Sequence, residues 1–150
     1  VTEASAATRT VPPSPAARAA PAPGADVLRA NLLYVEDNPV NAILMEAIVG
    51  MRPGLRLRVA QDGADALREA VAAPPDLLLL DMHLPDTDGI ALLHALRERP
   101  TLRDIPAVAV SAAARSEDIE RARAAGFAAY WTKPLDVDQT LAEIDRLLRA

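Results

Sequence analysis

Five short apolar runs, most of them free of polar residues, constrain the fold of this chain more than any other feature. They occupy residues 32–35, 55–60, 77–80, 107–110 and 128–131, and arginines interrupt the run at 55–60. A run without polar alternation predicts a strand that is buried on both faces. Strands of that kind belong to parallel sheets with helices on either side. We therefore expect these segments to lie side by side in the centre of the molecule.

Between these runs, large apolar residues recur at helical spacing, in segments 40–48, 64–71, 90–97 and 137–148. Asn38 and Pro39 are typical of a helix start, and Gly126 is typical of a helix end. Strands and helices in strict alternation predict an α/β fold. We expect a flavodoxin-like, doubly wound sandwich of five βα units, with a parallel five-stranded sheet in the order 2-1-3-4-5.

Polar side chains that can do chemistry stand at the ends of four of these runs. Glu36 and Asp37 follow the first run, Asp81 the third, Ser111 the fourth, and Lys133 the fifth. The carboxyl ends of parallel strands share one edge, where ligands bind at the point of strand-order reversal. Three carboxylates in one crevice repel each other unless a cation lies among them, and Mg²⁺ prefers oxygen ligands. The spacing therefore predicts a Mg²⁺ site at this edge.

The segment before the first run has a different composition. Residues 1–28 hold five of the thirteen prolines, many alanines and no periodic large apolar residues. Such a segment buries too little surface to offset its ordering entropy. It is expected to be a flexible linker or extension, with the folded domain spanning 29–150.

Composition excludes several functions. The net charge of −5 and pI near 5.0 argue against nucleic-acid binding by this chain. The absence of cysteine removes disulfides and thiolate metal sites. No apolar run approaches the roughly 18 residues of a membrane span, and no signal-peptide pattern is found, so we expect a cytoplasmic protein without membrane contact.

Four blocks of this sequence, in order and at matching distances, closely resemble response-regulator receiver domains of two-component signalling. They are Leu-Leu-Tyr-Val-Glu-Asp-Asn-Pro-Val-Asn (32–41), Leu-Leu-Leu-Leu-Asp-Met-His-Leu-Pro-Asp-Thr-Asp-Gly (77–89), Val-Ser-Ala (110–112) and Tyr-Trp-Thr-Lys-Pro (130–134). The resemblance covers about residues 30 to 150. The wording of the first two blocks is similar to that of receivers attached to hybrid histidine kinases.

The resemblance implies that Asp81 accepts a phosphoryl group with the help of Mg²⁺. It implies that Asp37 binds the metal directly and Glu36 through water. Asp81 and the backbone carbonyl of His83 would complete the protein ligands. Glu36 departs from the aspartate found in many members, but remains an oxygen ligand.

The resemblance also assigns roles to residues after the fourth and fifth runs. Ser111, which replaces the commoner threonine, would donate its hydroxyl to a phosphoryl oxygen, and Lys133 would pair with another. Ser111 and Tyr130 would form the switch pair that reports phosphorylation. The Lys133–Pro134 peptide bond is often cis in this family.

The expected partner is a histidine kinase or a histidine phosphotransfer protein, in a phosphorelay that donates from phosphohistidine. The chain would be the C-terminal receiver of a hybrid kinase or a stand-alone regulator, and not an enzyme beyond assisting its own modification.

Three alternatives are disfavoured. A haloacid-type phosphohydrolase needs a second acid where His83 stands, and a flavin carrier needs a phosphate loop in place of the acidic residues 36 and 37. A receiver-like module that is never phosphorylated would not need the intact site.

Overall fold

The computed structural model of the chain describes residues 28–149. The predicted linker over 1–28 lies outside the described residues, apart from Leu28. That residue packs against the apolar cluster under α6 (Val137–Arg149) and β1 (Ala30–Val35).

The centre of the molecule is a five-stranded sheet, and its topology confirms the predicted fold. The strands pair in parallel in the order β2-β1-β3-β4-β5. They are β1, β2 (Leu55–Ala60), β3 (Leu77–Asp81), β4 (Ala107–Ser111) and β5 (Ala129–Thr132). All residues of β3 and β4 are buried, as the unbroken apolar runs predict for central strands.

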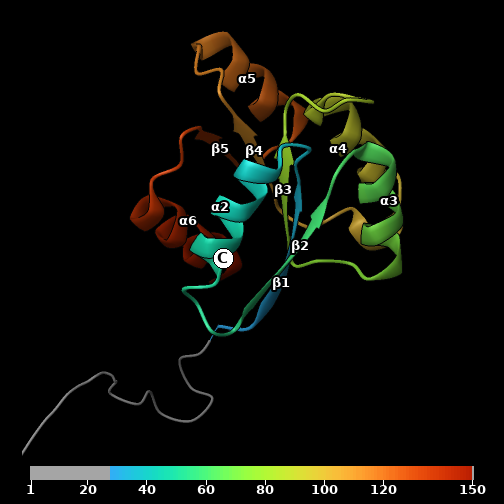
Figure 1. Cartoon of the computed structure of the whole chain (residues 1–150). Helices are drawn as coiled ribbons and strands as arrows, with labels where there is room; N and C mark the ends of the chain where they lie inside the picture. The colour runs from blue at the N-terminus through green and yellow to red at the C-terminus, as the bar shows by residue number, and fades with distance from the viewer. Residues whose placement is uncertain (1–27, 150) are drawn as a thin grey trace, which may run out of the picture.

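Helices cover both faces of this sheet (Figure 1). One face carries α2 (Pro39–Val49) and α6, and the other carries α3 (Gly63–Ala72), α4 (Gly89–Arg97) and α5 (Ser116–Ala125). A short 3-10 helix, η2 (Pro100–Leu102), precedes β4. Alternate residues of each strand enter the two apolar layers, because successive side chains of a strand point to opposite faces. Leu33 and Leu78, for example, lie in the layer under α3, α4 and α5, whereas Leu32 and Leu77 lie in the layer under α2 and α6.

Local signals set the helix ends close to the site. The Asn38 side chain accepts a hydrogen bond from the Val40 amide, and Pro39 occupies the first turn of α2. Gly126 ends α5 in the left-handed region at φ 110°, which a residue without Cβ adopts at little cost. The predicted cap at Asn38 and the predicted helix end at Gly126 are thus confirmed.

Most of the apolar stripe of segment 40–48 lies on the solvent side of α2, and only its last residue, Ile48, is buried, which the spacing alone does not indicate. Val40, Ile43 and Leu44 are 71%, 64% and 40% exposed. The buried residues of the helix are instead Met45, Ile48 and Val49. The helix is apolar on both sides, so periodicity could not say which side faces the core. None of the helices described between residues 28 and 149 combines the length and apolarity that a membrane crossing requires.

Candidate functional site

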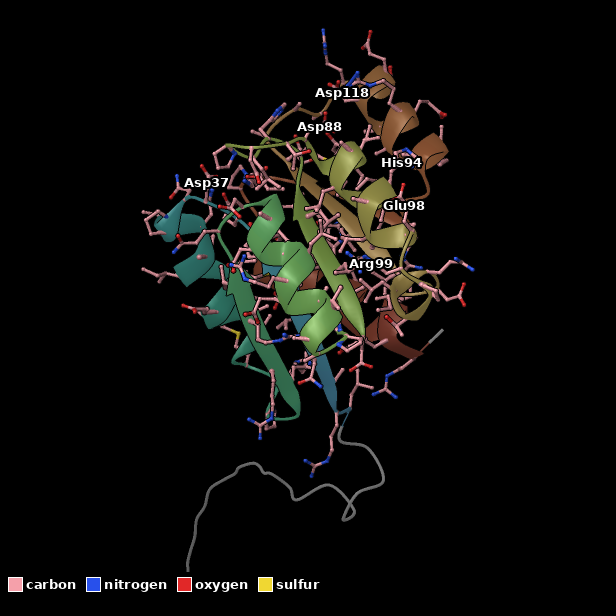
Figure 2. All side chains as sticks on the ribbon, turned by 90° about the vertical axis from the view of Figure 1, so that its right-hand side faces the viewer. Asp37, Asp88, His94, Glu98, Arg99 and Asp118 are labelled. Atoms are coloured by element: carbon pink, nitrogen blue, oxygen red, sulfur yellow. The ribbon has the colours of Figure 1, made fainter. Side chains whose placement is uncertain are left out.

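The residues predicted from the strand ends gather at the carboxyl edge of the sheet. Glu36 follows β1 directly, Asp81 and Ser111 are the last residues of β3 and β4, and Lys133 follows β5. Figure 2 shows Asp37, Asp88 and Asp118 at this same end of the molecule, and His94 further along α4. The sheet therefore brings together residues that are widely separated in the chain.

Three carboxylates form the centre of the site. One ligand oxygen each from Glu36, Asp37 and Asp81 lies within 4.8 Å of the other two. Glu36 is 2% exposed and Asp81 is 5% exposed, whereas Asp37 is open to solvent. The cluster therefore has two buried acids and one acid at its mouth.

The ammonium group of Lys133 lies between the two buried acids. Its Nζ is 2.8 Å from Glu36 Oε1 and 3.5 Å from Asp81 Oδ2. In this structure the lysine therefore pairs more closely with Glu36 than with Asp81. The Lys133–Pro134 peptide bond that precedes α6 is cis, as the resemblance implied.

Tyr34 also belongs to this site, although the sequence pattern predicts only a buried strand residue at this position. Its hydroxyl donates to Glu36 Oε1 at 2.8 Å, so this oxygen accepts from both Tyr34 and Lys133. The other oxygen, Oε2, accepts from the Asn38 amide at 3.2 Å. The available signal was the spacing of two residues between Tyr34 and Glu36, which puts both side chains on one face of β1.

Burial and hydrogen bonding push the two buried acids in opposite directions. Burial raises the pKa of Asp81 to about 6, opposed by the His83 amide and Lys133 and reinforced by Glu36. Burial also acts to raise the pKa of Glu36, but hydrogen bonds from Lys133, Tyr34 and the Asn38 amide outweigh it and hold that pKa below its ordinary value. The first proton taken up by the pair therefore goes to Asp81.

Ser111 and Tyr130 are joined through the backbone of Ala113. The Ser111 Oγ accepts from the Ala113 amide at 3.0 Å, and the Tyr130 hydroxyl donates to the Ala113 carbonyl at 2.7 Å. Ser111 is 1% exposed, while Tyr130 is half-buried. The hydroxyl hydrogen of Ser111 is left free to be donated to another group.

A cavity of about 350 Å³ adjoins this pair of side chains. It is lined by residues from the β3–α4 loop, α4, the end of β4, the β4–α5 loop, α5 and β5: Met82, His83, Asp88, Ile90, Ser111, Ala113, Asp118, Arg121 and Tyr130. Ala113 lines this cavity, and its neighbours Ala112 and Ala114 have equally small side chains.

Hydrogen bonds from backbone amides to aspartate side chains fix the loop between β3 and α4. The His83 amide donates to Asp81 Oδ1 at 3.1 Å, and His83 also forms an isolated bridge with Asp88. Asp86 accepts from the Gly63 amide at 2.8 Å, which ties the loop to the start of α3. The imidazoles of His83 and His94 are exposed. His94 lies on the surface of α4, away from the acidic cluster (Figure 2).

The donor set of the cluster fits Mg²⁺. Three carboxylates, two of them buried, supply hard oxygen ligands, and this kind of ligand is what Mg²⁺ requires. A single lysine leaves the three negative charges incompletely balanced, so a divalent cation would complete the neutralisation. Glu36, Asp37 and Asp81 are the residues that could hold it.

Comparison with known proteins agrees with this fold. The model of the response regulator receiver domain family matches residues 32–145. The polar-differentiation response regulator DivK of Brucella anthropi is 34% identical over 118 residues, which cover 79% of this chain and 95% of that protein.

Solved structures give the same result. A response regulator structure from Chloroflexus aurantiacus has a TM-score of 0.77 and 25% identity, and the match covers 82% of this chain and 100% of that one. The receiver domain of sensor histidine kinase PA1611 from Pseudomonas aeruginosa has a TM-score of 0.74 and 31% identity, with the same coverage. That receiver holds a magnesium ion in its active-site cleft.

The fold, the acidic edge and these matches define a class of signalling domain. The chain belongs to the response regulator receiver domain family. It is a receiver domain of two-component signalling, and among its relatives is the regulator DivK. Receivers of two-component systems interact with histidine kinases or phosphotransfer proteins, and they generally act as signalling domains without catalysing reactions on other molecules.

Proposed function

We propose that Asp81 accepts a phosphoryl group from a phosphohistidine, with Mg²⁺ held by Glu36, Asp37, Asp81 and the backbone carbonyl of His83. One observation carries this proposal above the others. Asp81 is buried at the end of β3, in one cluster with two further acids and 3.5 Å from the Lys133 ammonium group. A carboxylate in this position is a nucleophile surrounded by groups that can stabilise phosphoryl charge.

The transfer needs little covalent work from the protein. An oxygen of Asp81 forms a bond to phosphorus while the P–N bond of the phosphoimidazole breaks, and the bonding electron pair stays on the ring nitrogen. Lys133 is a mobile cation close enough to leave Glu36 and pair with a phosphoryl oxygen. Mg²⁺, when bound, would neutralise charge on the transferring group.

A change at the switch pair would carry the signal outward. The free hydroxyl hydrogen of Ser111 can be donated to a phosphoryl oxygen on Asp81. Such a contact would shift Ala113, whose amide donates to Ser111 Oγ and whose carbonyl accepts from the Tyr130 hydroxyl. Phosphorylation would therefore bias the position of Tyr130 and of the face formed by α5, β5 and α6.

The exposed side of α2 supports a helical partner as the phosphoryl donor. Val40, Ile43, Leu44 and Ala47 are exposed at spacings of three and four residues, which is the pattern of a helix that packs along another helix, and the exposed Met51 follows in the turn after α2. Val40 lies three residues after Asp37, so a partner on this stripe is close to the mouth of the site. A histidine kinase or phosphotransfer protein that presents its phosphohistidine on a helix matches this arrangement.

The relatives suggest two kinds of protein in which this domain could occur. Similarity to the receiver of a sensor histidine kinase favours the C-terminal receiver of a hybrid kinase, and similarity to DivK favours a single-domain regulator. We infer a cytoplasmic location in both, because the phosphoryl donor derives from cytoplasmic ATP. The coding sequence upstream of Val1 distinguishes the two settings: a kinase core there would establish the hybrid.

Labelling of the purified protein tests the central step. Acetyl phosphate with Mg²⁺ should add one phosphoryl group, measured by intact mass, and the label should be released by alkali and by hydroxylamine, as an acyl phosphate is. Asp81→Asn nearly preserves shape but removes the nucleophile, so it should take no label. Glu98→Gln, which neutralises an exposed carboxylate at the end of α4, is the matched control and should be labelled like the parent.

Two results would contradict the proposal. The first is a label on Asp81→Asn equal to that of the parent. The second is a label that is stable to alkali and labile to acid, as expected of a phosphohistidine, which would point to His83 or His94.

A further inference from the structure

We propose that Tyr34 is a positioning residue, which keeps Glu36 in place when Lys133 leaves it for the phosphoryl group. The inference rests on the proposed function and adds a residue to the site. Three hydrogen bonds, two of them to one carboxylate oxygen, carry it.

Glu36 Oε1 accepts from two donors of very different mobility. The Tyr34 hydroxyl and the Lys133 Nζ are each 2.8 Å from this oxygen. The tyrosine is 1% exposed and its ring is part of the apolar layer between the sheet and α2 and α6. Its hydroxyl is therefore fixed by the packing of β1, whose register places Tyr34 between Val59 and Leu79.

Lys133 is held in a different way. Its side chain is 19% exposed and reaches the site from the loop after β5, on a flexible four-carbon stem. It is also only 3.5 Å from Asp81 Oδ2, so a small movement brings it to a phosphoryl group on Asp81. The lysine is thus the donor that can leave Glu36, and the tyrosine is the donor that stays.

The departure of Lys133 has a cost that falls on Glu36. A carboxylate that is 2% exposed loses its only cationic side-chain partner among the described residues and one of the two hydrogen bonds to Oε1, and the loss of a donor at a buried carboxylate oxygen is unfavourable even with a metal ion nearby. With Tyr34 in place, Oε1 keeps one hydrogen bond and Oε2 keeps the bond from the Asn38 amide. The hydroxyl therefore lowers the cost of moving Lys133, and this should favour the phosphorylated state more than the unmodified state.

A double-mutant cycle separates this role from simple packing. Tyr34→Phe removes the hydroxyl and keeps the ring. Its rate of labelling by acetyl phosphate at saturating Mg²⁺ should fall at least fivefold, because Lys133 no longer has a substitute at Glu36. Its Mg²⁺ affinity, measured by calorimetry without phosphodonor, should stay within about twofold of the parent, since Lys133 still pairs with Glu36 in that state.

The second arm of the cycle uses a background that lacks the Lys133 ammonium group. In Lys133→Ala, Glu36 has the same donors before and after phosphorylation, so adding Tyr34→Phe should change the residual labelling rate by less than twofold. Val108→Ala is the packing control, because Val108 lies in the same apolar layer as Tyr34 and makes no polar contact through its side chain. It should lower the melting temperature and leave the labelling rate of the otherwise unchanged protein as it is.

Each outcome has a definite meaning. Parental labelling by Tyr34→Phe would overturn the inference and leave the proposed function standing. Equal slowing by Tyr34→Phe in both backgrounds, or equal slowing by Val108→Ala, would reduce Tyr34 to a packing residue. A parent protein that takes no label, or a labelled Asp81→Asn, would overturn the inference together with the proposed function.

Discussion

Neutralising Asp81 should stabilise the metal-free protein at neutral pH, because the folded state holds this carboxylate at a cost. The pKa of Asp81 is raised from 3.8 to about 6, first by burial and then by Glu36. A group whose pKa is higher in the folded state favours unfolding once it is ionised. The difference of about two pH units corresponds to at most roughly 3 kcal/mol at pH 7. Because Asp81→Asn also gives up the attraction of Lys133, we expect a net gain of about 1–2 kcal/mol.

The pH window of this gain follows from the two pKa values. Above about pH 6 the carboxylate is ionised in both states, so the full cost is present and Asp81→Asn gains most. Between about pH 6 and 4 the folded protein takes up the proton first, and the gain decreases. Below about pH 4 both states are protonated and the gain disappears.

Thermal unfolding from pH 4 to pH 8 in the presence of a chelator measures this effect. The melting temperature of Asp81→Asn should exceed that of the parent by roughly 4–8 °C at pH 7, and the two curves should converge near pH 4. Glu98→Gln should follow the parent at every pH. Saturating Mg²⁺ should shrink or reverse the difference at pH 7, because it neutralises the parent site. A variant that is no more stable than the parent at pH 7, or a gain that does not change with pH, would refute the electrostatic reasoning.

The remaining predictions concern the metal, the partner surface and the predicted linker. Asp37→Ala should weaken Mg²⁺ binding at least tenfold in calorimetry, or about 1.4 kcal/mol, and unchanged affinity would disprove its role as ligand. Ile43→Lys should leave the melting temperature within about 2 °C and labelling by acetyl phosphate unchanged, because the residue is 64% exposed, but it should slow transfer from the cognate phosphohistidine protein. Equal transfer to the variant would remove α2 from the interface. Deleting residues 1–25 should leave thermal stability nearly unchanged, and a loss of several degrees would show that the segment packs on the domain.

Much of the fold could be predicted because two signals agree in this sequence. Segments 77–80 and 107–110 lack polar residues, which identifies strands buried on both faces, and turn and cap residues such as Asn38 and Gly126 separate the elements. Once the sheet is parallel, its carboxyl edge must collect the polar residues that follow the strands. The proximity of Glu36, Asp37 and Asp81 is therefore a consequence of topology and needs no long-range information beyond it.

Other features depend on packing that a single sequence does not encode. The α2 helix is apolar on both sides, so its periodicity fits inward and outward placement of Ile43 equally well. Tyr34 is typical of a buried strand position, and its bond to Glu36 depends on where the hydroxyl ends in three dimensions. The closer pairing of Lys133 with Glu36 than with Asp81 is likewise decided by a difference of less than 1 Å between two distances, 2.8 Å and 3.5 Å.

The pair between Lys133 and Glu36 joins residues that are 97 positions apart in the chain. The site therefore forms only when the first and last strands have both joined the sheet, and no fragment that lacks either strand can contain it. A ligand that binds there selects the complete fold, and by mass action it protects the whole domain from opening. At a hundredfold excess over its dissociation constant, such a ligand adds about 2.7 kcal/mol to the free energy of unfolding. Mg²⁺ at the acidic edge should accordingly slow proteolysis even at distant positions of this domain that become accessible only when the whole domain unfolds.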